Sequence, residues 1–538
     1  MNPITMDWQL PFPSGRQPVL ARNVVATSQP LAAQAGAAAF ARGGNAIDAA
    51  LAAAITLTVV EPTMNGIGGD AFALVWDGQT LHGLNAAGRS PQGWHPDRFA
   101  GLDAMPRIGW DSVTVPGGVS AWSALSERFG QLPFEDLFLD AIRHASDGFP
   151  VSPVIARQWA TAVDELHAQP GFAAFMPRGR APRVGEIWRF ADQARTLQEI
   201  ARTRGESFYR GPLAQAISAL AAEHGAALDA DDLREHRCEW VDPISVGFGG
   251  HRVHEIPPSG QGVAALMALG ILQQLAYADT APGSAQRLHL EVEAMRLAFA
   301  DLQAHVGDPA SMRTSTQALL DPDYLRERAR RIDPAHAGHH PPGQPAGGGT
   351  VYLCTADAQG RMVSFIQSNY KGFGSGVVVP GTGIALHNRG FGFVTTPGHP
   401  NQVGGRKRPL HSIIPAFVTR EGRPVMAFGV MGGNMQAQGH AQMVLRHVVE
   451  GLNPQACSDA PRWRIDDHGA LTVESTVSPE VIDGLRGMGH APNVAAQDSL
   501  DFGSAQMIVH LDAETGDGDG HAYAAGSDHR RDGQAIGC

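Results

Sequence analysis

A threonine that follows three glycines is the residue with the clearest chemical potential in this sequence. Thr350 comes directly after Gly347, Gly348 and Gly349, and it opens a strand-like run, TVYLCT. A threonine hydroxyl is a weak nucleophile, but a free α-amine on the same residue can serve as its base. The pKa of an α-amine is about 7.7–8.0, which suits a general base near neutral pH. Cleavage of the chain before Thr350 would create that amine, although Gly-Gly-Gly-Thr alone is more typical of a loop that enters a strand.

The segment before this threonine has the composition of an exposed linker. Residues 335–349 are rich in proline, glycine and histidine and show no apolar periodicity. His336, His339 and His340 lie in this segment without neighbouring cysteine or carboxylate partners, so we expect no metal site there. The linker ends a helix-rich region, 1–349, and a strand-rich region, 350–538, follows it.

Several elements around this junction are predictable from local pattern. Asn45 can cap a helix over 46–60, and a long amphipathic pattern predicts a helix over 285–305. A third helix is expected at about 439–450. Apolar runs predict strands, and these include 71–76, 111–115, 351–356 and 362–367.

Bulk composition excludes several classes of function. The 538 residues are 43% hydrophobic and 17% charged, with a net charge of −12, which argues against a nucleic-acid partner. No window has the roughly 18 apolar residues of a membrane span, and residues 1–22 lack the apolar core of a secretory signal. The four cysteines form no CxxC pair and are expected to be free thiols. We therefore expect a cytoplasmic enzyme without membrane contact.

Ten short motifs, in order over nearly the whole chain, resemble the γ-glutamyltranspeptidase family of N-terminal-nucleophile hydrolases. Any one of them is weak evidence, but ten in register are specific. They are GGNAIDAA at 43–50, EP at 61–62 with GIGG at 66–69, VPG at 115–117, PPS at 257–259, VEAM at 292–295 with AD at 300–301 and GDP at 307–309, Thr350 with Asp357 and Gly360, KRPL at 407–410, GG at 432–433, GLN at 451–453 with APR at 460–462, and RRDG at 530–533.

The resemblance implies an α+β fold, a four-layer αββα sandwich, and a precursor that cuts itself between Gly349 and Thr350. A large subunit, 1–349, and a small subunit, 350–538, would result. Thr350 would be the nucleophile, Ser368 a supporting hydroxyl, and Gly432 and Gly433 the oxyanion hole. Asn369 and Tyr370 would contact substrate. No cofactor or metal is expected, and a dimer of such two-subunit units is left open.

The sequence departs from the family at the head-group pocket. The arginine that clamps an α-carboxylate is replaced by Ala87, with Arg89 two residues later, and the segment that binds the α-amine, HNRGFGF at 387–393, has no carboxylate. The family's Ser-Ser pair is His411-Ser412. An ammonium needs a carboxylate partner or it stays solvated, so this pocket is predicted to hold an acyl group with negative charge. Arg89, Arg389, His411 and Ser412 are the candidates to bind it.

These departures resemble the oxamate amidohydrolase and the cephalosporin (glutaryl) acylase branches of the family. The predicted function is therefore hydrolysis of a small anionic amide through an acyl-enzyme on Thr350. Two alternatives stay open, a glutaryl or cephalosporin acylase and a γ-glutamyl hydrolase or transferase that acts on glutathione. The latter would apply if the register near Arg89 slips by two residues. A non-enzymatic scaffold should have lost Thr350, Ser368 or the paired glycines, and all are present.

Overall fold

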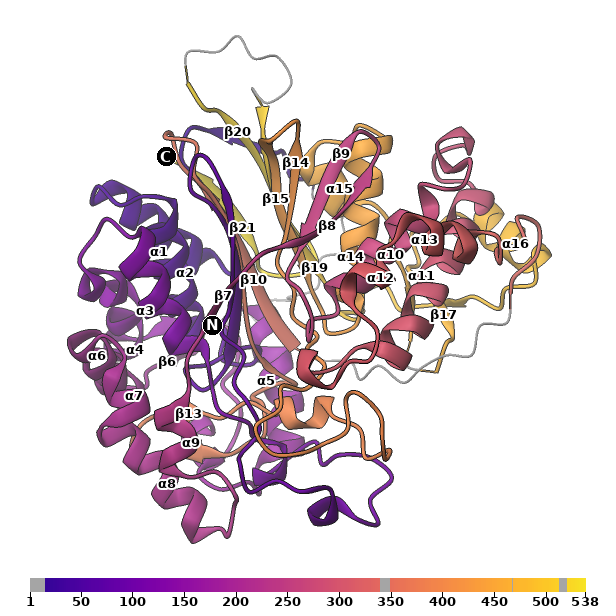
Figure 1. The fold of residues 1–538 in the computed structure, drawn as a ribbon. Coiled ribbons are helices and arrows are strands. Elements are labelled where there is room, and N and C mark those ends of the chain that lie inside the picture. The colour runs from indigo at the N-terminus through magenta and orange to yellow at the C-terminus, as the bar shows by residue number, and fades with distance from the viewer. Residues whose placement is uncertain (1–14, 339–348, 467, 512–519) are drawn as a thin grey trace, which may run out of the picture.

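In a computed structural model, the chain is described for residues 15–338, 349–466, 468–511 and 520–538. Two seven-stranded sheets stack face to face, and helices cover the outer face of each (Figure 1). One sheet has the strand order β21-β2-β10-β11-β3-β4-β7 and the other β1-β20-β19-β15-β14-β9-β8. This is the four-layer arrangement that the sequence predicts.

The first sheet carries the predicted nucleophile. Its strands are β2 (Val24–Thr27), β3 (Asp70–Trp76), β4 (Leu81–Asn85), β7 (Glu239–Val241), β10 (Gly349–Ala356), β11 (Met362–Tyr370) and β21 (Gln534–Gly537). All nine residues of β11 are buried. Strands covered on both faces show apolar runs rather than alternation, which is why the runs at 351–356 and 362–367 predict these two strands correctly.

Small residues let helices pack tightly on this sheet. Helices α1 (Pro30–Ala41) and α2 (Ala46–Val60) lie against it, and every residue of α2 is buried. Asn45 caps α2 by accepting hydrogen bonds from the backbone of Ile47 and Asp48, as the sequence predicts. The remaining helices on this side are α3 (Gly118–Phe129), α4 (Leu139–Asp147), α5 (Pro153–Leu166), α6 (Ala191–Thr203), α7 (Glu206–Arg210), α8 (Pro212–Glu223) and α9 (Ala230–Glu235).

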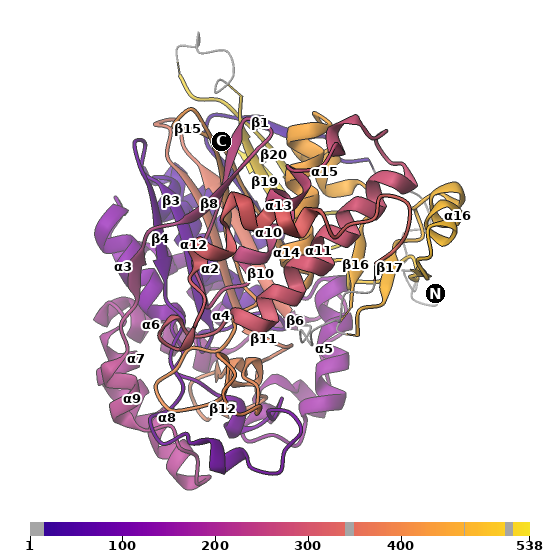
Figure 2. The same cartoon turned by 45° about the vertical axis from the view of Figure 1, so that its right-hand side comes forward.

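The second sheet is covered by a different helical layer, which the turned view brings forward (Figure 2). Its strands are β1 (Val19–Ala21), β8 (Ile244–Phe248), β9 (His251–Glu255), β14 (Ala416–Arg420), β15 (Arg423–Met431), β19 (Ser504–His510) and β20 (Tyr523–Ser527). Its helices include α10 (Gly262–Leu272), α11 (Ala285–His305), α13 (Pro322–Ala329), α14 (Met435–Val444), α15 (Pro454–Asp459) and α16 (Pro479–Gly487). Between the sheets, aromatic and aliphatic side chains such as Phe72, Tyr352 and Phe417 form the inner core.

Two predicted elements differ from the structure. Residues 111–115 do not form a strand: a short 3₁₀ turn, Trp110–Ser112, is followed by extended chain. The backbone groups of this segment form hydrogen bonds outside the sheets. Val115 N donates to Arg89 O (3.0 Å), and Thr114 O accepts from the His387 side chain (2.9 Å). The helix predicted at 439–450 begins four residues earlier, at Met435, and continues through a π-helical turn to Val449.

Candidate active site

Thr350 lies near the start of β10, at an irregularity in the ladder. Gly349 pairs with Tyr370 and Val351 with Gln367, so the register shifts at Thr350. Strand irregularities of this kind are common beside active sites, because they change the direction in which a side chain points. Thr350 is buried, and its hydroxyl donates to Ser368 Oγ at 3.3 Å. Ser368 Oγ also accepts the backbone N–H of Tyr370 at 2.7 Å. The predicted pair of hydroxyls is therefore in contact.

The paired glycines lie between β15 and α14. Gly432 and Gly433 have φ of 131° and 62°, a region that favours glycine. A Cβ on Gly432 would lie 2.8 Å from the Cα of Gly503, so a side chain has no room there. The N-terminus of α14 follows directly, and such an end carries positive electrostatic potential. This is a suitable place to stabilise an oxyanion.

Gln436, in the first turn of α14, completes the contacts of the threonine hydroxyl. Its Nε2 donates to Thr350 Oγ1 at 3.2 Å, and its Oε1 accepts from Ile414 N at 3.0 Å. Because Oε1 faces a backbone donor, the amide nitrogen must face the threonine. Sequence reasoning missed this residue, since the predicted helix began at 439.

Six of the predicted site residues belong to one closed ring of contacts, together with Gln261 and Gln436. From Thr350 the ring runs through Ser368 to Tyr370, whose aromatic ring lies 4.5 Å from the Arg389 guanidinium carbon. Arg389 donates to Ser412 Oγ at 2.8 Å. Gln261 Nε2 then links the carbonyls of Ser412 and Gly433, and the latter is 2.8 Å away. Gly433 O accepts from Gln436 N at 3.2 Å, which returns the ring to Thr350.

Arg389 is the unusual member of this ring. It is 1% exposed, and its Nε and second terminal nitrogen have no hydrogen-bond partner among the described residues. Burial lowers the pKa of the guanidinium to about 10, while the charge of Asp70 acts in the opposite direction. The group is therefore still a cation at neutral pH. A buried cation with unused donors is suited to receive an anion.

A carboxylate that sequence reasoning did not single out lies beside this arginine. Asp70 starts β3 and pairs with Ser368 in the ladder. Its Oδ1 accepts Gly117 N at 2.9 Å, and its Oδ2 lies 3.1 Å from His411 Nε2 and 3.4 Å from His387 Nδ1. Burial alone would raise its pKa, but the charge and hydrogen bond of His387 and the hydrogen bond of His411 outweigh this and hold the pKa low. The signal in the sequence that could have identified Asp70 is its position directly after the glycine loop at 66–69.

His411 is held neutral by the same surroundings. Burial and the Arg389 charge lower its pKa to about 3, against the opposing influence of Asp70. Its Nε2 faces Asp70, and its Nδ1 accepts from Ile413 N at 3.4 Å. The expectation of a pocket without a carboxylate is thus incomplete, because Asp70 is present. Both oxygens of Asp70, however, already contact donors of the protein.

Asn369 supplies a second buried polar group with unused capacity. The side chain is 0% exposed, and neither its amide nitrogen nor its oxygen has a partner among the described residues. It packs closely against the glycine loop, since a Cβ on Gly66 would lie 2.9 Å from its Nδ2. The neighbouring Tyr370 has a φ of 78°, a strained value for a bulky residue.

Arg89 is not brought into this ring. Its guanidinium contacts Glu239 (3.3 Å), Asp308 (3.4 Å) and the carbonyl of Arg406 (3.1 Å), and its side chain is 43% exposed. Ala87, in contrast, is fully buried in the inner core. The structure therefore groups Arg389, His411 and Ser412, but separates Arg89 from them.

Comparison with known proteins identifies the family. The family model described as gamma-glutamyltranspeptidase matches residues 32–538. The chain belongs to the γ-glutamyltranspeptidase family. A crystal structure of cephalosporin acylase from Bacillus halodurans has a TM-score of 0.92 and 45% identity, and 99% of each chain is covered. The fold prediction is confirmed, and so is the prediction of an amidohydrolase of this family.

Two curated relatives illustrate the range of this γ-glutamyltranspeptidase branch. The oxamate amidohydrolase proenzyme of Klebsiella pneumoniae is 36% identical, with 89% of this chain and 93% of the relative covered. The glutathione hydrolase-like YwrD proenzyme of Bacillus subtilis is 35% identical, with 96% and 98% covered. No helix in the described part of the chain is long and apolar enough to cross a bilayer.

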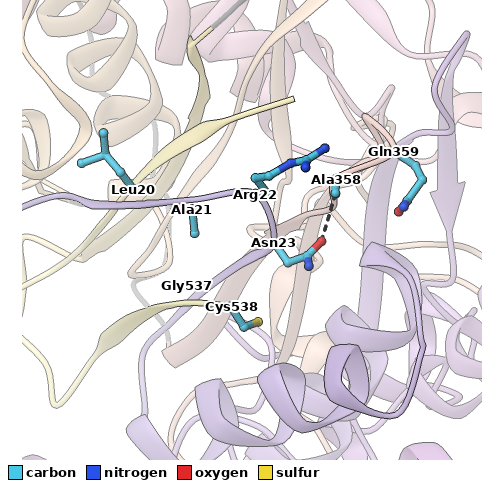
Figure 3. Close-up of a pocket in the computed structure, with 8 residues that line it drawn as sticks. All are labelled: Leu20, Ala21, Arg22, Asn23, Ala358, Gln359, Gly537 and Cys538. Atoms are coloured by element: carbon cyan, nitrogen blue, oxygen red, sulfur yellow. Dashed lines mark hydrogen bonds between the residues drawn. The ribbon is translucent and has the colours of Figure 1, made fainter. Parts of the chain in front are cut away.

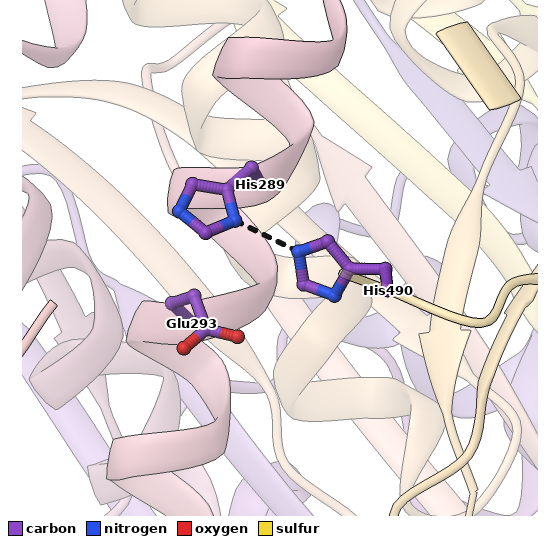
Figure 4. A group of neighbouring side chains, drawn as sticks. All are labelled: His289, Glu293 and His490. Atoms are coloured by element: carbon purple, nitrogen blue, oxygen red, sulfur yellow. Dashed lines mark hydrogen bonds between the residues drawn. The ribbon is translucent and has the colours of Figure 1, made fainter. Parts of the chain in front are cut away.

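One further group of potential metal ligands occurs among the described residues of this family member. His289 and Glu293 of α11 meet His490, all buried (Figure 4). His289 Nε2 contacts the carbonyl of Asp333 (2.8 Å), so its Nδ1 accepts from His490 Nε2 (2.8 Å). Arg296 contacts both Glu293 (2.8 Å) and His490 Nδ1 (3.4 Å). These side chains already form a hydrogen-bonded cluster, in which Arg296 supplies the positive charge. We therefore assign no metal to the cluster.

A surface pocket of about 620 Å³ lies at the opposite end of β10 (Figure 3). Ala358 and Gln359, just beyond that strand, line it together with Arg22, Asn23 and Cys538. At about 3.3 Å per residue, the strand carries the chain roughly 20 Å from Thr350 to Ala356. The pocket is therefore separate from the ring of contacts around Thr350.

Proposed function

We propose that this protein is a self-cleaving amidohydrolase whose nucleophile is Thr350 and whose substrate is a small anionic amide. Cleavage between Gly349 and Thr350 would leave a large subunit, 1–349, and a small subunit, 350–538. The freed α-amine of Thr350 would then accept the hydroxyl proton, and Ser368 would hold the hydroxyl in place. The N–H groups at Gly432 and Gly433 would stabilise the oxyanion.

The unfilled donors of buried Arg389 carry the substrate assignment. A guanidinium can hold a carboxylate through two parallel hydrogen bonds, and here two of its nitrogens are unused. Asn369 offers an unused donor and acceptor. His411, Ser412 and Tyr370 would orient the arginine and complete the pocket wall. A small amide whose acyl part carries its own carboxylate, such as oxamate or a dicarboxylic monoamide, satisfies these groups. The oxamate amidohydrolase relative is named for an amide of this class.

A second candidate rests on Asp70. A carboxylate in the pocket is what an α-ammonium requires, and a γ-glutamyl acyl group would bring one. We rank this candidate lower because both oxygens of Asp70 already accept bonds from Gly117 N and the histidines. A cytoplasmic location also remains a prediction from the sequence.

Maturation tests the nucleophile. Incubated purified protein should split into two fragments, and the smaller should begin Thr-Val-Tyr. Thr350→Ala should stay uncut and inactive. Cleavage at another bond, or full activity of an uncut chain, would contradict the mechanism.

A substrate panel tests the pocket. We expect kcat/KM on the matured enzyme to favour oxamate or a glutaryl amide over glutathione by a large factor, because buried polar sites reject ligands without matching groups. Glutathione preferred by about tenfold or more would instead support the Asp70 candidate.

A further inference from the structure

Gln436 offers the one side-chain amide that donates to the threonine hydroxyl among the described residues, and the proposed mechanism does not yet use it. Its Nε2 is 3.2 Å from Thr350 Oγ1, and the same hydroxyl donates to Ser368 Oγ at 3.3 Å. The glutamine is fully buried and is held by Ile414 N and by its position in the first turn of α14. The donor is thus fixed before any reaction begins.

We infer that Gln436 is a catalytic residue of ester hydrolysis: it stabilises negative charge on Thr350 Oγ1 when that oxygen leaves the acyl group. This inference rests on the proposed role of Thr350. In deacylation, water adds to the ester carbonyl and loses a proton to the α-amine. The C–Oγ1 bond then breaks, its electron pair goes to Oγ1, and the ammonium returns the proton. The products are the carboxylic acid and the free hydroxyl.

The hydrogen bond from Gln436 should matter less for acylation of Thr350 than for deacylation. When an amide acylates the enzyme, the difficult event is expulsion of the amine, and Oγ1 then carries no charge because it is bonded to carbon. When the ester is hydrolysed, Oγ1 itself is expelled and becomes negative. A hydrogen bond to a charged oxygen is roughly twice as strong as one to a neutral oxygen. Loss of the donor should therefore slow deacylation more than acylation.

Self-cleavage contains the same step. Attack of Thr350 Oγ1 on the Gly349 carbonyl breaks the C–N bond and forms an ester, and water must then break the new C–Oγ1 bond. Gln436 is therefore expected to act in maturation as well as in turnover. This matters for the test, because maturation needs no substrate except the chain and water.

The principal variant is Gln436→Met, which keeps side-chain length and removes the donor. Gln438→Met is the matched control, because Gln438 is a buried glutamine of the same helix whose Nε2 bonds Ile465 O at 3.0 Å instead. We expect Gln436→Met to split about 10- to 100-fold more slowly than wild type, the range expected for one hydrogen bond to a charged group. Hydroxylamine, which attacks esters, should restore the splitting and leave a hydroxamate on the large fragment.

Turnover gives a second readout on protein that has matured. With an amide substrate, Gln436→Met should release one equivalent of amine quickly and then slow down, and intact mass should show the acyl group on the fragment that begins at Thr350. Thermal unfolding checks the fold of both variants. If the methionine variant does not fold, Gln436→Glu serves instead at pH 8, because it keeps the size and the acceptor for Ile414 N.

The outcomes separate this inference from the proposed function. A wild-type chain that never splits overturns the nucleophile itself. A wild type that splits but hydrolyses no amide in the panel overturns only the substrate assignment. Splitting of Gln436→Met at the wild-type rate overturns the role of Gln436. A folded variant that hydroxylamine cannot split also overturns it, because the defect then lies in ester formation.

Discussion

The two sides of the candidate site around Thr350 are built from different kinds of groups. On the reaction side, Ser368, Gln436 and the Gly432-Gly433 backbone are all neutral. On the recognition side, Arg389 and Asp70 are buried charges, and neutral His411 contacts Asp70. Neutral groups around a nucleophile can respond to charge that appears only during reaction. Buried charges, in contrast, cost free energy unless a group of opposite charge pairs with them. They therefore discriminate between ligands at the binding step, before any reaction begins.

This contrast separates the groups proposed to act in the reaction from those proposed to bind the substrate. Ser368, which contacts the hydroxyl of the proposed nucleophile, stands at the position that the family resemblance implies, whereas the head-group pocket departs at Ala87, His387–Phe393 and His411. Changes on the reaction side should therefore lower kcat, and changes on the recognition side should alter substrate preference.

Gly433→Val should cause the largest loss. The φ of 62° at Gly433 is strained for a β-branched residue, so the loop should shift and withdraw its N–H donors. Loss of one oxyanion donor corresponds to roughly 10²–10³-fold in kcat. Steady-state kinetics on matured enzyme should show kcat falling much more than KM rises. A rise in KM alone would place the oxyanion donors elsewhere.

Arg389→Met should be the largest effect on the recognition side, about 100-fold in kcat/KM for an anionic amide, because a buried charge partner is lost. A neutral amide of similar size should lose much less. Arg389→Lys is the matched control, since lysine keeps the positive charge but cannot form the bidentate pair of hydrogen bonds. Equal losses on anionic and neutral substrates would break the division between the two sides.

His411→Gln should change how stability depends on pH. The folded protein holds the His411 pKa at about 3, whereas a histidine in the unfolded chain titrates near 6.5. As the pH falls below about 6.5, the unfolded chain gains a proton that the folded chain does not, so stability is lost by up to about 1.4 kcal/mol per pH unit. The glutamine variant should lose less between pH 7 and 4, as measured by denaturant unfolding.

That window lies above the range in which Asp70 titrates. Its depressed pKa contributes stability that is present above the unfolded value, near 3.9, and is lost only as the pH falls through the folded value. Parallel pH slopes for wild type and His411→Gln would mean that His411 is already charged in the folded state.

Arg89→Gln should have the smallest effect. Its partners Glu239 and Asp308 form a partly exposed ion-pair group, and such pairs contribute at most about 1 kcal/mol. We expect kcat/KM to change by less than about fivefold. A loss near 100-fold would restore Arg89 as the carboxylate clamp and favour the γ-glutamyl alternative.

Several elements of this protein could be predicted from the sequence because their signals are local. The Asn45 cap, the apolar runs that became β10 and β11, and the glycines before Thr350 act through neighbouring residues, so their consequences are visible in order along the chain. The family motifs added the layer order of the fold and the pairing of Thr350 with Ser368.

The charges in the pocket, in contrast, depend on how distant segments pack together. Asp70, Gln436 and Arg389 lie far apart in sequence, and their roles depend on which strand ends and helix turns meet. Arg89 shows the same dependence, since its guanidinium contacts Glu239 and Asp308 and takes no part in the ring of contacts around Thr350. Burial and hydrogen-bond partners set the charge state of a side chain, and both come from long-range packing that no local pattern contains.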